Sequence, residues 1–547
     1  MPAFPLPAAP ITRRGFVLGA GSTAVLLGTG AAPAHAGSPA HQPRHGMPDY
    51  PFKVGVASGD PLPNSVVLWT RLVPDLFAAD GRGGMPRRKV PVQWEVAKDD
   101  RFRTVVKRGT VLATPELNHS VHPEVWGLEP DRHYYYRFRV GGEISPVGRT
   151  KTAPAYGARN RSVSFAYASC AFWTAGYFTA YRHLADDDLD VVLHLGDYVY
   201  EHGIRADGGR AGTTDPAVRD VRIPEQFLPE TTTLSRYRLQ YNLYKSDPDL
   251  MAAHQAHPWV VTFDDHEVEN NWAGLIPEAS SQTPGALFAP RLSDGLQAYY
   301  ENLPLRASAM PDGPGIQVFR RLSYGGLVDF HVLDTRQHRT DQATAATNAA
   351  LRWDPTRTML GARQEQWLAD GLARSAATWQ VVAQQVRFSE MDQQIGEGET
   401  YAVDNWDGYA HARGQLFDAV QERGVENLVV ITGDQHNNWV SDLKPEPLDP
   451  GSPTLGVEFL VTSVTSDGDG YDTSATTRNR LAENPTGHFY QSRRGYQRAV
   501  ATPTELRVDV RSLPAVTVPD QPVATRWSGY VEAGRPGLAH AQDGTIV

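Results

Sequence analysis

The sequence predicts an α/β domain preceded by a smaller all-β domain. From Phe52 to Thr152, short alternating runs are separated by turn residues, with no helical pattern between them. After residue 160, near-continuous apolar runs alternate with helical stretches, a pattern typical of strands covered on both faces. A chain of 547 residues is also too long for one hydrophobic core, and its length predicts about two to four domains.

Residues 1–36 carry an export signal. Arg13 and Arg14 precede a moderately apolar run diluted by glycine, and Ala34-His35-Ala36 forms a small-residue cleavage site. Paired arginines in this position indicate the twin-arginine export machinery. The alternative is a membrane anchor, but the run is shorter than the roughly 20 apolar residues of a span and ends at a cleavage signature. We therefore expect a secreted protein whose signal peptide is removed, with no transmembrane anchor.

Charge and cysteine content narrow the function further. The net charge of -10 argues against a stable nucleic-acid partner, which needs clustered Lys and Arg. Cys170 is the only cysteine, so no internal disulfide exists. The twin-arginine route moves folded proteins, so a metal ion can be inserted before export. A lone cysteine in such a protein fits a buried ligand to that metal.

The all-β region is expected to form a β-sandwich over residues 51–152, after an N-terminal arm at residues 37–50. Its clearest strands are predicted at residues 65–70, 90–96, 103–112 and 132–140. Residues 128–136 resemble the late-strand segment of fibronectin type III domains. No residue here suggests chemistry, so docking or shielding is the expected role.

The second domain is expected over residues 160–547, including a C-terminal tail from Thr502 whose position relative to the site stays open. Strands are predicted at residues 163–168, 189–195, 259–263, 316–322, 327–333, 378–383, 427–432 and 456–461. Helices are predicted at residues 176–185, 234–254, 362–373 and 411–422. Residues 207–230 and 276–291 lack periodicity and predict long loops that overhang the site.

Potential ligands follow four of these strands at their carboxyl ends. They are Cys170; Asp197 with Tyr200; Asp264, Asp265 and His266; and Asp434 with His436. Open α/β sheets place their sites at this edge. Carboxylates and a phenolate suit a hard trivalent metal, with the thiolate as a softer exception. The sequence therefore predicts a metal centre.

Each motif also has a simpler interpretation. Asp264 and Asp265 would suit a helix N-cap, and an isolated buried cysteine is usually a small core residue. Four strand ends carrying such groups together favour the metal.

Other polar and aromatic residues receive structural interpretations or stay open. Arg336 would contact phosphate or hold a loop by ion pairing, whereas Asp467 and Asp469 favour a turn over a calcium loop. His194 is expected in the core. Trp353 and Trp406 line a substrate mouth or pack on the surface.

These strand endings resemble the calcineurin-like metallophosphoesterases. Gly196-Asp197-x-x-Tyr200 is similar to the motif with which purple acid phosphatases supply a bridging Asp and an iron-bound tyrosinate. Three departures from the usual motifs resemble the alkaline phosphatase D (PhoD) family: Cys170 replaces the first aspartate motif, residues 264–267 replace Gly-Asn-His-Glu, and residues 433–436 replace Gly-His-x-His. That family includes a secreted Streptomyces-type phospholipase D. The resemblance covers almost the whole mature chain, including residues 54–61, 333–336 and 466–470.

The resemblance implies a four-layer α/β/β/α metallophosphoesterase sandwich behind the fibronectin-III-like sandwich. It implies Fe3+ bound by Cys170, Asp197 and Tyr200, with His436 or Asp434 completing the set. It also implies one or two Ca2+ ions held by Asp197, Asp265 and neighbours, with Asp264 and Asn271 as further candidates. Mn2+ or another divalent ion is an alternative at the second position.

The expected function is a secreted phosphoesterase, an alkaline phosphatase and phosphodiesterase that hydrolyses mono- and diesters by metal-activated hydroxide. Asp197 would bridge the ions, and His266 would protonate the leaving oxygen. The alternative within this class is phospholipase D activity at the same site. The rival from another class is a non-catalytic module that binds cell-wall polymer and lacks a complete ligand set. Substrate preference, the number and kind of divalent ions and oligomeric state stay open.

Overall fold

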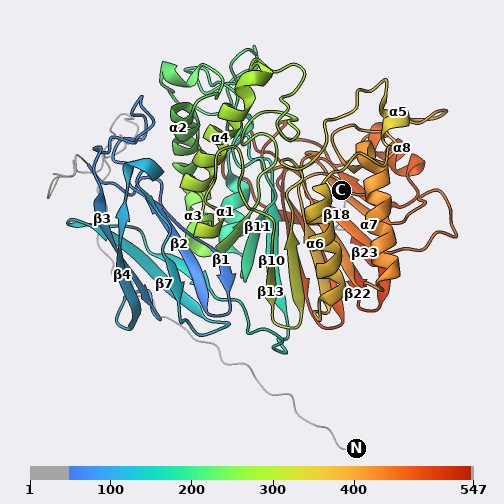
Figure 1. Cartoon of the computed structure of the whole chain (residues 1–547), viewed down its shortest axis with the longest axis horizontal. Helices are drawn as coiled ribbons and strands as arrows, with labels where there is room; N and C mark the ends of the chain where they lie inside the picture. Colours follow the sequence, from blue (N-terminus) through green and yellow to red (C-terminus); the bar gives the residue numbers. More distant parts are fainter. Residues whose placement is uncertain (1–48, 544–547) are drawn as a thin grey trace, which may run out of the picture. The chain divides into compact units, whose positions relative to one another are not determined.

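Three β-sheets organise residues 49–543, the part of the chain that the computed structural model describes (Figure 1). The predicted signal at residues 1–36 and all but the last two residues of the predicted arm lie outside the described residues. Among the described residues, no helix combines the length and apolar character that a membrane crossing requires.

The largest sheet has 11 strands, and its parallel centre carries the first three predicted site loops. Its order is β23 (Arg535–Asp543), β22 (Ala524–Glu532), β21 (Glu505–Ser512), β20 (Gly495–Ala501), β10 (Val163–Ala168), β11 (Val191–His194), β12 (Pro258–Val261), β1 (Val56–Leu62), β2 (Ser65–Arg71) and β5 (Ser120–Val121), with β6 (Glu124–Trp126) also on β2. The described part of the C-terminal tail therefore extends this sheet as β21 to β23.

Two smaller sheets complete the fold. The seven-stranded sheet has the order β13 (Arg320–Tyr324), β14 (Val328–Val332), β15 (Trp379–Ala383), β16 (Leu428–Thr432), β18 (Gly456–Leu460), β17 (Asn438–Leu443) and β19 (Gly487–Gln491). The five-stranded sheet has the order β4 (Val105–Ala113), β3 (Val90–Ala97), β7 (His133–Val140) and β8 (Glu143–Ile144), with β9 (Gly148–Lys151) also on β7.

Helices cover the outer faces of the two larger sheets. One group consists of α1 (Thr179–Asp186), α2 (Leu234–Lys245), α3 (Pro248–Ala256) and α4 (Gly285–Asn302), of which α2 to α4 are green in Figure 1. This group shares an apolar core with β11 and β12. The other group, α6 (Gly361–Arg374) and α7 (Ala410–Glu422), packs on the seven-stranded sheet. The short helices α5 (Asn348–Leu351) and α8 (Ala475–Glu483) contribute little to these cores.

A third core lies between the two sheets themselves. It joins Phe165 and Leu193 of the large sheet to Phe330, Val381 and Val429 of the seven-stranded sheet. Strands buried on both faces explain the near-continuous apolar runs of the sequence. The predicted four-layer α/β/β/α sandwich is confirmed.

The N-terminal β-sandwich shares one of its two layers with the large sheet. Val66 and Leu68 of β2 pack against Val92 and Phe138 of the five-stranded sheet. However, β1 pairs in parallel with β12, with Ser58 opposite Pro258, so the layer that contains β1 and β2 continues the sheet that carries the site. Backbone pairing between distant segments leaves no mark in local periodicity, and the sequence pattern did not reveal it.

Several predicted boundaries were wrong. The single helix expected over residues 234–254 is two helices, because Asp247 caps α3 by accepting from the Asp249 amide at 3.0 Å and Pro248 opens that helix. The loop expected over residues 276–291 gives way to α4 at Gly285. The strand expected from residue 316 starts at Arg320.

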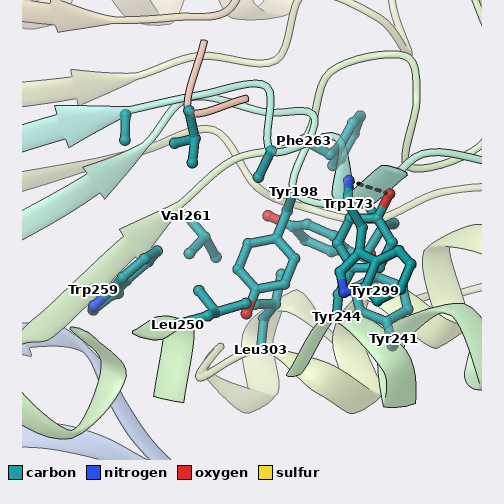
Figure 2. Close-up of a cluster of buried hydrophobic side chains, with 14 of the residues drawn as sticks. Trp173, Tyr198, Tyr241, Tyr244, Leu250, Trp259, Val261, Phe263, Tyr299 and Leu303 are labelled. Carbon is teal, nitrogen blue, oxygen red and sulfur yellow. Dashed lines mark hydrogen bonds between the residues drawn. The ribbon is translucent and has the colours of Figure 1, made fainter. Parts of the chain in front are cut away.

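An aromatic layer under the large sheet supports the loop that follows β11 (Figure 2). Tyr198 of this loop packs in that layer near Trp259 and Tyr241. The Tyr244 hydroxyl accepts hydrogen bonds from the Trp173 and Tyr200 amides at 3.2 and 3.3 Å. A close-packed base of this kind fixes the backbone from which the neighbouring site residues project.

Candidate metal centre

The four predicted strand-end loops meet at one place. Cys170 follows β10, Asp197 follows β11, and residues 264–266 follow β12, three neighbouring parallel strands of the large sheet. Asp434 and His436 follow β16 of the seven-stranded sheet. The site therefore lies where the two sheets present their carboxyl ends together, as expected for an α/β fold.

The backbone of these loops is strained at the predicted site residues. Cys170, Asp197, Asp434 and His436 have φ angles of 59°, 55°, 68° and 53°. Non-glycine residues rarely adopt this left-handed region, and such strain clusters at functional sites. Hydrogen bonds hold the first two loops together, since the Cys170 amide donates to the Gly196 carbonyl at 3.1 Å and the Ala171 amide donates to the Asp197 carbonyl at 2.9 Å.

The predicted site residues supply three overlapping groups of potential ligand atoms, and within each group the atoms lie within 4.8 Å of one another. The groups are Cys170, Asp197 and His436; Asp197, Asp265 and His266; and Asp264, Asp265 and Asp434. Asp197 is common to the first two groups, and Asp265 to the last two. This overlap is the geometry that two or more adjacent cations require.

Tyr200 lies against the thiol-containing group. Its hydroxyl donates to Asp197 Oδ2 at 3.1 Å and lies 3.2 Å from His436 Nε2 and 2.7 Å from Ser466 Oγ. Asn271 contacts the carboxylate groups through its backbone, whose amide donates to Asp265 Oδ2 at 2.8 Å. The ligand role of the Asn271 side chain stays a prediction.

Without a bound cation, the surroundings of these residues disfavour their anionic forms. Burial and neighbouring negative charges raise the pKa of Cys170, Tyr200, Asp197 and Asp434 well above their ordinary values. Burial likewise raises the pKa of Asp264 to about 7, although Arg336 opposes that shift. Buried carboxylates persist as anions only beside compensating positive charge.

An unpartnered atom points to the same conclusion. Asp264 Oδ2 is buried and has no hydrogen-bond partner among the described residues. Buried polar atoms in folded proteins are almost always paired, so this one is available to a ligand. Oxygen, nitrogen and sulfur donors in this arrangement fit metal ions.

Glu267 links the loop that follows β11 to the loop that follows β12. Its fully buried carboxylate accepts hydrogen bonds from the backbone amides of Asp197, Tyr198 and Asp264 at 3.1, 2.8 and 2.9 Å. Three converging amides fix the positions of both strand ends. The sequence motif contained Glu267, but its role depends on contacts across the fold.

Arg336 resolves the choice between phosphate contact and ion pairing. Its fully buried guanidinium pairs with Asp264 and, at 3.3 Å, with Asp265, and donates to Asp404 at 2.9 and 3.0 Å. It therefore holds the β12 loop and does not line the cavity described below. Asp404 had no recognisable sequence signal.

The Gly-rich loop at residues 466–470 is a turn, as favoured, but one of its carboxylates reaches the site. Asp469 anchors the loop by accepting from the Val516 and Thr517 amides at 2.7 and 2.9 Å. Asp467 Oδ2 lies 2.7 Å from His436 Nδ1, which directs His436 Nε2 toward Tyr200. Carboxylates commonly orient metal-binding histidines in this way.

His266 is held by a carboxylate that the sequence analysis missed. Its Nδ1 lies 2.7 Å from Glu201 Oε2, and its ring stacks on Tyr200 at 4.2 Å. Its Nε2 lies 3.9 Å from Asp265 Oδ2, on the side of the ligand cluster. Burial alone would lower the pKa of His266, but the charges of Glu201, Asp265 and Asp197 raise it well above its usual range.

A cavity of about 420 Å³ opens beside His266. The two predicted overhanging loops contribute to its wall. The first supplies Arg210 and Glu230, and the second supplies Glu278, Ser280, Ser281 and Gln282. Phe172, Tyr200, His436 and Asp467 also line it. The lining is mainly polar and carries several carboxylates.

The remaining histidine and tryptophans have structural positions. His194 is fully buried and bonds to the Tyr181 hydroxyl at 2.9 Å, which confirms a core histidine. Trp406 is buried between α6 and α7 and not at a substrate mouth. Trp353 is 56% exposed and lies outside the cavity lining.

Comparisons with known proteins agree with this architecture. A family model described as PhoD-like phosphatase matches residues 165–510, and one described as PhoD-like phosphatase, N-terminal domain, matches residues 37–154. Alkaline phosphatase D of Bacillus subtilis (strain 168) is 45% identical over 538 residues, covering 98% of this chain and 90% of that protein. A solved structure described as Structure of PhoD matches with a TM-score of 0.84 and 44% identity, covering 92% of this chain and 94% of that one.

Proposed function

This chain belongs to the PhoD-like phosphatase family and is a metal-dependent phosphoesterase, and from that premise we propose that it is exported and hydrolyses phosphate mono- and diesters. The observation that carries the proposal is the position of Asp197. It belongs both to the ligand set that contains the Cys170 thiol and to the set that contains Asp265 and His266. One carboxylate shared between two donor sets suits two unlike cations that act on the same phosphate. Membership of a phosphatase family and 45% identity to an alkaline phosphatase D over nearly the whole chain argue against the non-catalytic alternative.

We assign the thiol-containing position to Fe3+ and the carboxylate-rich position to one or two Ca2+ ions. Cys170, Asp197, Tyr200 and His436 would hold the iron. Asp197, Asp264, Asp265 and Asp434 would hold calcium, with Asn271 as a further oxygen donor. Mn2+ or another divalent ion is the alternative at the second position.

Ions bound at these positions would bind phosphate oxygens and lower the pKa of water to supply hydroxide near neutral pH. The protein's own contribution begins with Glu267, which fixes the loops of Asp197 and Asp264. His266 Nε2 faces the cluster and is placed to donate a proton to the leaving oxygen, while Glu201 on Nδ1 orients the ring and stabilises its protonated form.

Phospholipase D activity remains the alternative substrate class and has no better support. The cavity lining is mainly polar, with Phe172 and Tyr200 as its aromatic members, and offers little apolar surface to an acyl chain. Small phosphoesters with a polar leaving group suit it better.

Export is proposed from the sequence alone. Arg13, Arg14 and the Ala34-His35-Ala36 cleavage site support the twin-arginine route, with removal of residues 1–36. Replacing Arg13 and Arg14 by Lys should retain the protein inside the cell in the host, and continued secretion of this variant would contradict the route.

The catalytic proposal is tested on protein isolated without added metals. We expect iron and calcium by elemental analysis, and hydrolysis of nitrophenyl phosphate and bis-nitrophenyl phosphate. Faster turnover of phosphatidylcholine than of either would favour phospholipase D. Turnover that survives exhaustive chelation would contradict the metal-dependent mechanism.

A further inference from the structure

A fourth donor group shares His266 with the catalytic cluster and lines the cavity. Glu201, His202 and His266 each offer a ligand atom, and these atoms lie within 4.8 Å of one another. We propose that these three residues form an inhibitory site for Zn2+, distinct from the catalytic ions.

The donor chemistry is that of a zinc site. Two imidazoles and one carboxylate form a common zinc ligand set, and three protein ligands leave the fourth position to water. The catalytic groups differ, because each contains at most one histidine and most of their donors are carboxylates. Imidazole donors favour zinc, whereas carboxylate oxygens favour calcium.

The distances suit a shared ion. His266 Nδ1 lies 2.7 Å from Glu201 Oε2, and His202 Nδ1 lies 3.6 Å from Glu201 Oε1. Ligands on a tetrahedral zinc ion lie about 3.4 Å apart, given zinc to ligand bonds of about 2.0–2.2 Å. The Glu201 carboxylate lies between the two rings, so small side-chain shifts bring all three donors to one ion.

His202 is available to such an ion. Neither of its ring nitrogens makes a hydrogen bond to the described residues, and its Nδ1 lies 3.6 Å from Glu201 Oε1. Its backbone is fixed, since the Gln240 side chain donates to the His202 carbonyl at 3.3 Å, and Phe172 packs against the ring at 5.6 Å. Glu201, His202 and His266 all line the cavity, which gives an ion access from solvent.

Inhibition rests on the proposed function, in which His266 is the proton donor. Zinc on Nδ1 would take the place of a proton and end the Glu201 hydrogen bond. The ring would then be neutral, and loss of its Nε2 proton would leave an imidazolate, which makes it a much poorer acid than the imidazolium. Zinc should therefore slow the hydrolysis of phosphate esters of basic alcohols more than that of nitrophenyl esters. A basic alkoxide leaving group needs protonation, whereas nitrophenolate leaves without it.

The first test counts bound zinc on the metal-loaded enzyme by equilibrium dialysis. We expect one zinc ion more per chain in the wild type than in His202→Asn. His133→Asn is the control, because His133 is exposed on β7 of the five-stranded sheet and should leave the count unchanged. Equal zinc counts in wild type and His202→Asn would overturn the site, whatever the activity.

The second test is kinetic and includes a comparison that needs no variant. The half-inhibitory zinc concentration should rise at least about tenfold in His202→Asn. In the wild type, zinc should inhibit an alkyl phosphate several-fold more than nitrophenyl phosphate. Equal inhibition of both substrates, or of both proteins, would mean that zinc acts at the catalytic ions and would overturn the proposal. Zinc bound through His202 in a protein without turnover would contradict the proposed function and leave the site intact.

Discussion

Replacing Glu201 by Gln tests whether the carboxylate on His266 contributes to catalysis. The carboxylate lies 2.7 Å from Nδ1, and the two side chains are 4% and 12% exposed, so solvent screens the interaction little. A hydrogen bond between charged groups contributes about 1.5–3 kcal/mol, which corresponds to about 10- to 150-fold in rate if the interaction is complete in the transition state. We expect kcat for an alkyl phosphate to fall within that range and kcat for nitrophenyl phosphate to fall much less.

The pH profile gives a second readout with a defined sign. The charge of Glu201 raises the pKa of His266, and the pair holds the pKa of Glu201 at about 2 even though burial alone would raise it. Removing the charge lowers the pKa of His266, so the acid form is lost at a lower pH. The alkaline limb of the rate profile should therefore move to lower pH in Glu201→Gln.

A matched control is available in the same cavity. Glu278 accepts from the Asn270 side chain and the Ser280 hydroxyl, both at 2.6 Å, and does not contact His266. Glu278→Gln should leave the alkaline limb in place. Equal rate losses for alkyl and nitrophenyl esters in Glu201→Gln, with an unmoved limb, would refute the assigned proton transfer.

Three other perturbations test the ligand cluster. A tyrosinate on Fe3+ absorbs visible light, so the purified protein should be coloured and Tyr200→Phe should bleach it; a colourless, active, iron-free wild type would remove this assignment. Cys170→Ala should lose iron and activity, and unchanged metal content would return this thiol to a core role. Glu267→Ala leaves three buried backbone amides without an acceptor, at a cost of about 1–3 kcal/mol each. The free energy of unfolding, measured with denaturant, should therefore fall by at least about 3 kcal/mol. A fall of less than about 1 kcal/mol would contradict the role of Glu267 in fixing the two loops.

Strand ends were the most predictable part of the site. The run predicted at residues 163–168 is β10, with the same limits, and the other central strands were located to within a few residues. A buried strand is recognised in the sequence by its apolar composition, and a polar residue directly after it indicates the edge of the sheet. For that reason the sequence alone predicts that Cys170, Asp197, Asp265 and His436 lie together.

Partners that act across the fold were not predictable in this way. Asp404 belongs to a loop without periodicity, and its pairing with Arg336 depends on how that loop folds over the β12 loop. Glu201 is adjacent to the Tyr200 motif in sequence, yet its contact with His266 depends on the packing of β11 beside β12. Side-chain pairing at such separations follows from sheet order, which local sequence does not encode.

By itself, the sequence determined the α/β class and the identity of the groups at the strand ends, because both follow from the local alternation of apolar and polar residues. Only the tertiary structure decided that β1 extends the same sheet, that Asp197 joins two ligand groups, and that Glu201 holds His266. These are contacts between residues far apart in the chain or on different strands. They are fixed by the order in which strands pair and sheets pack, and that order depends on the whole chain at once.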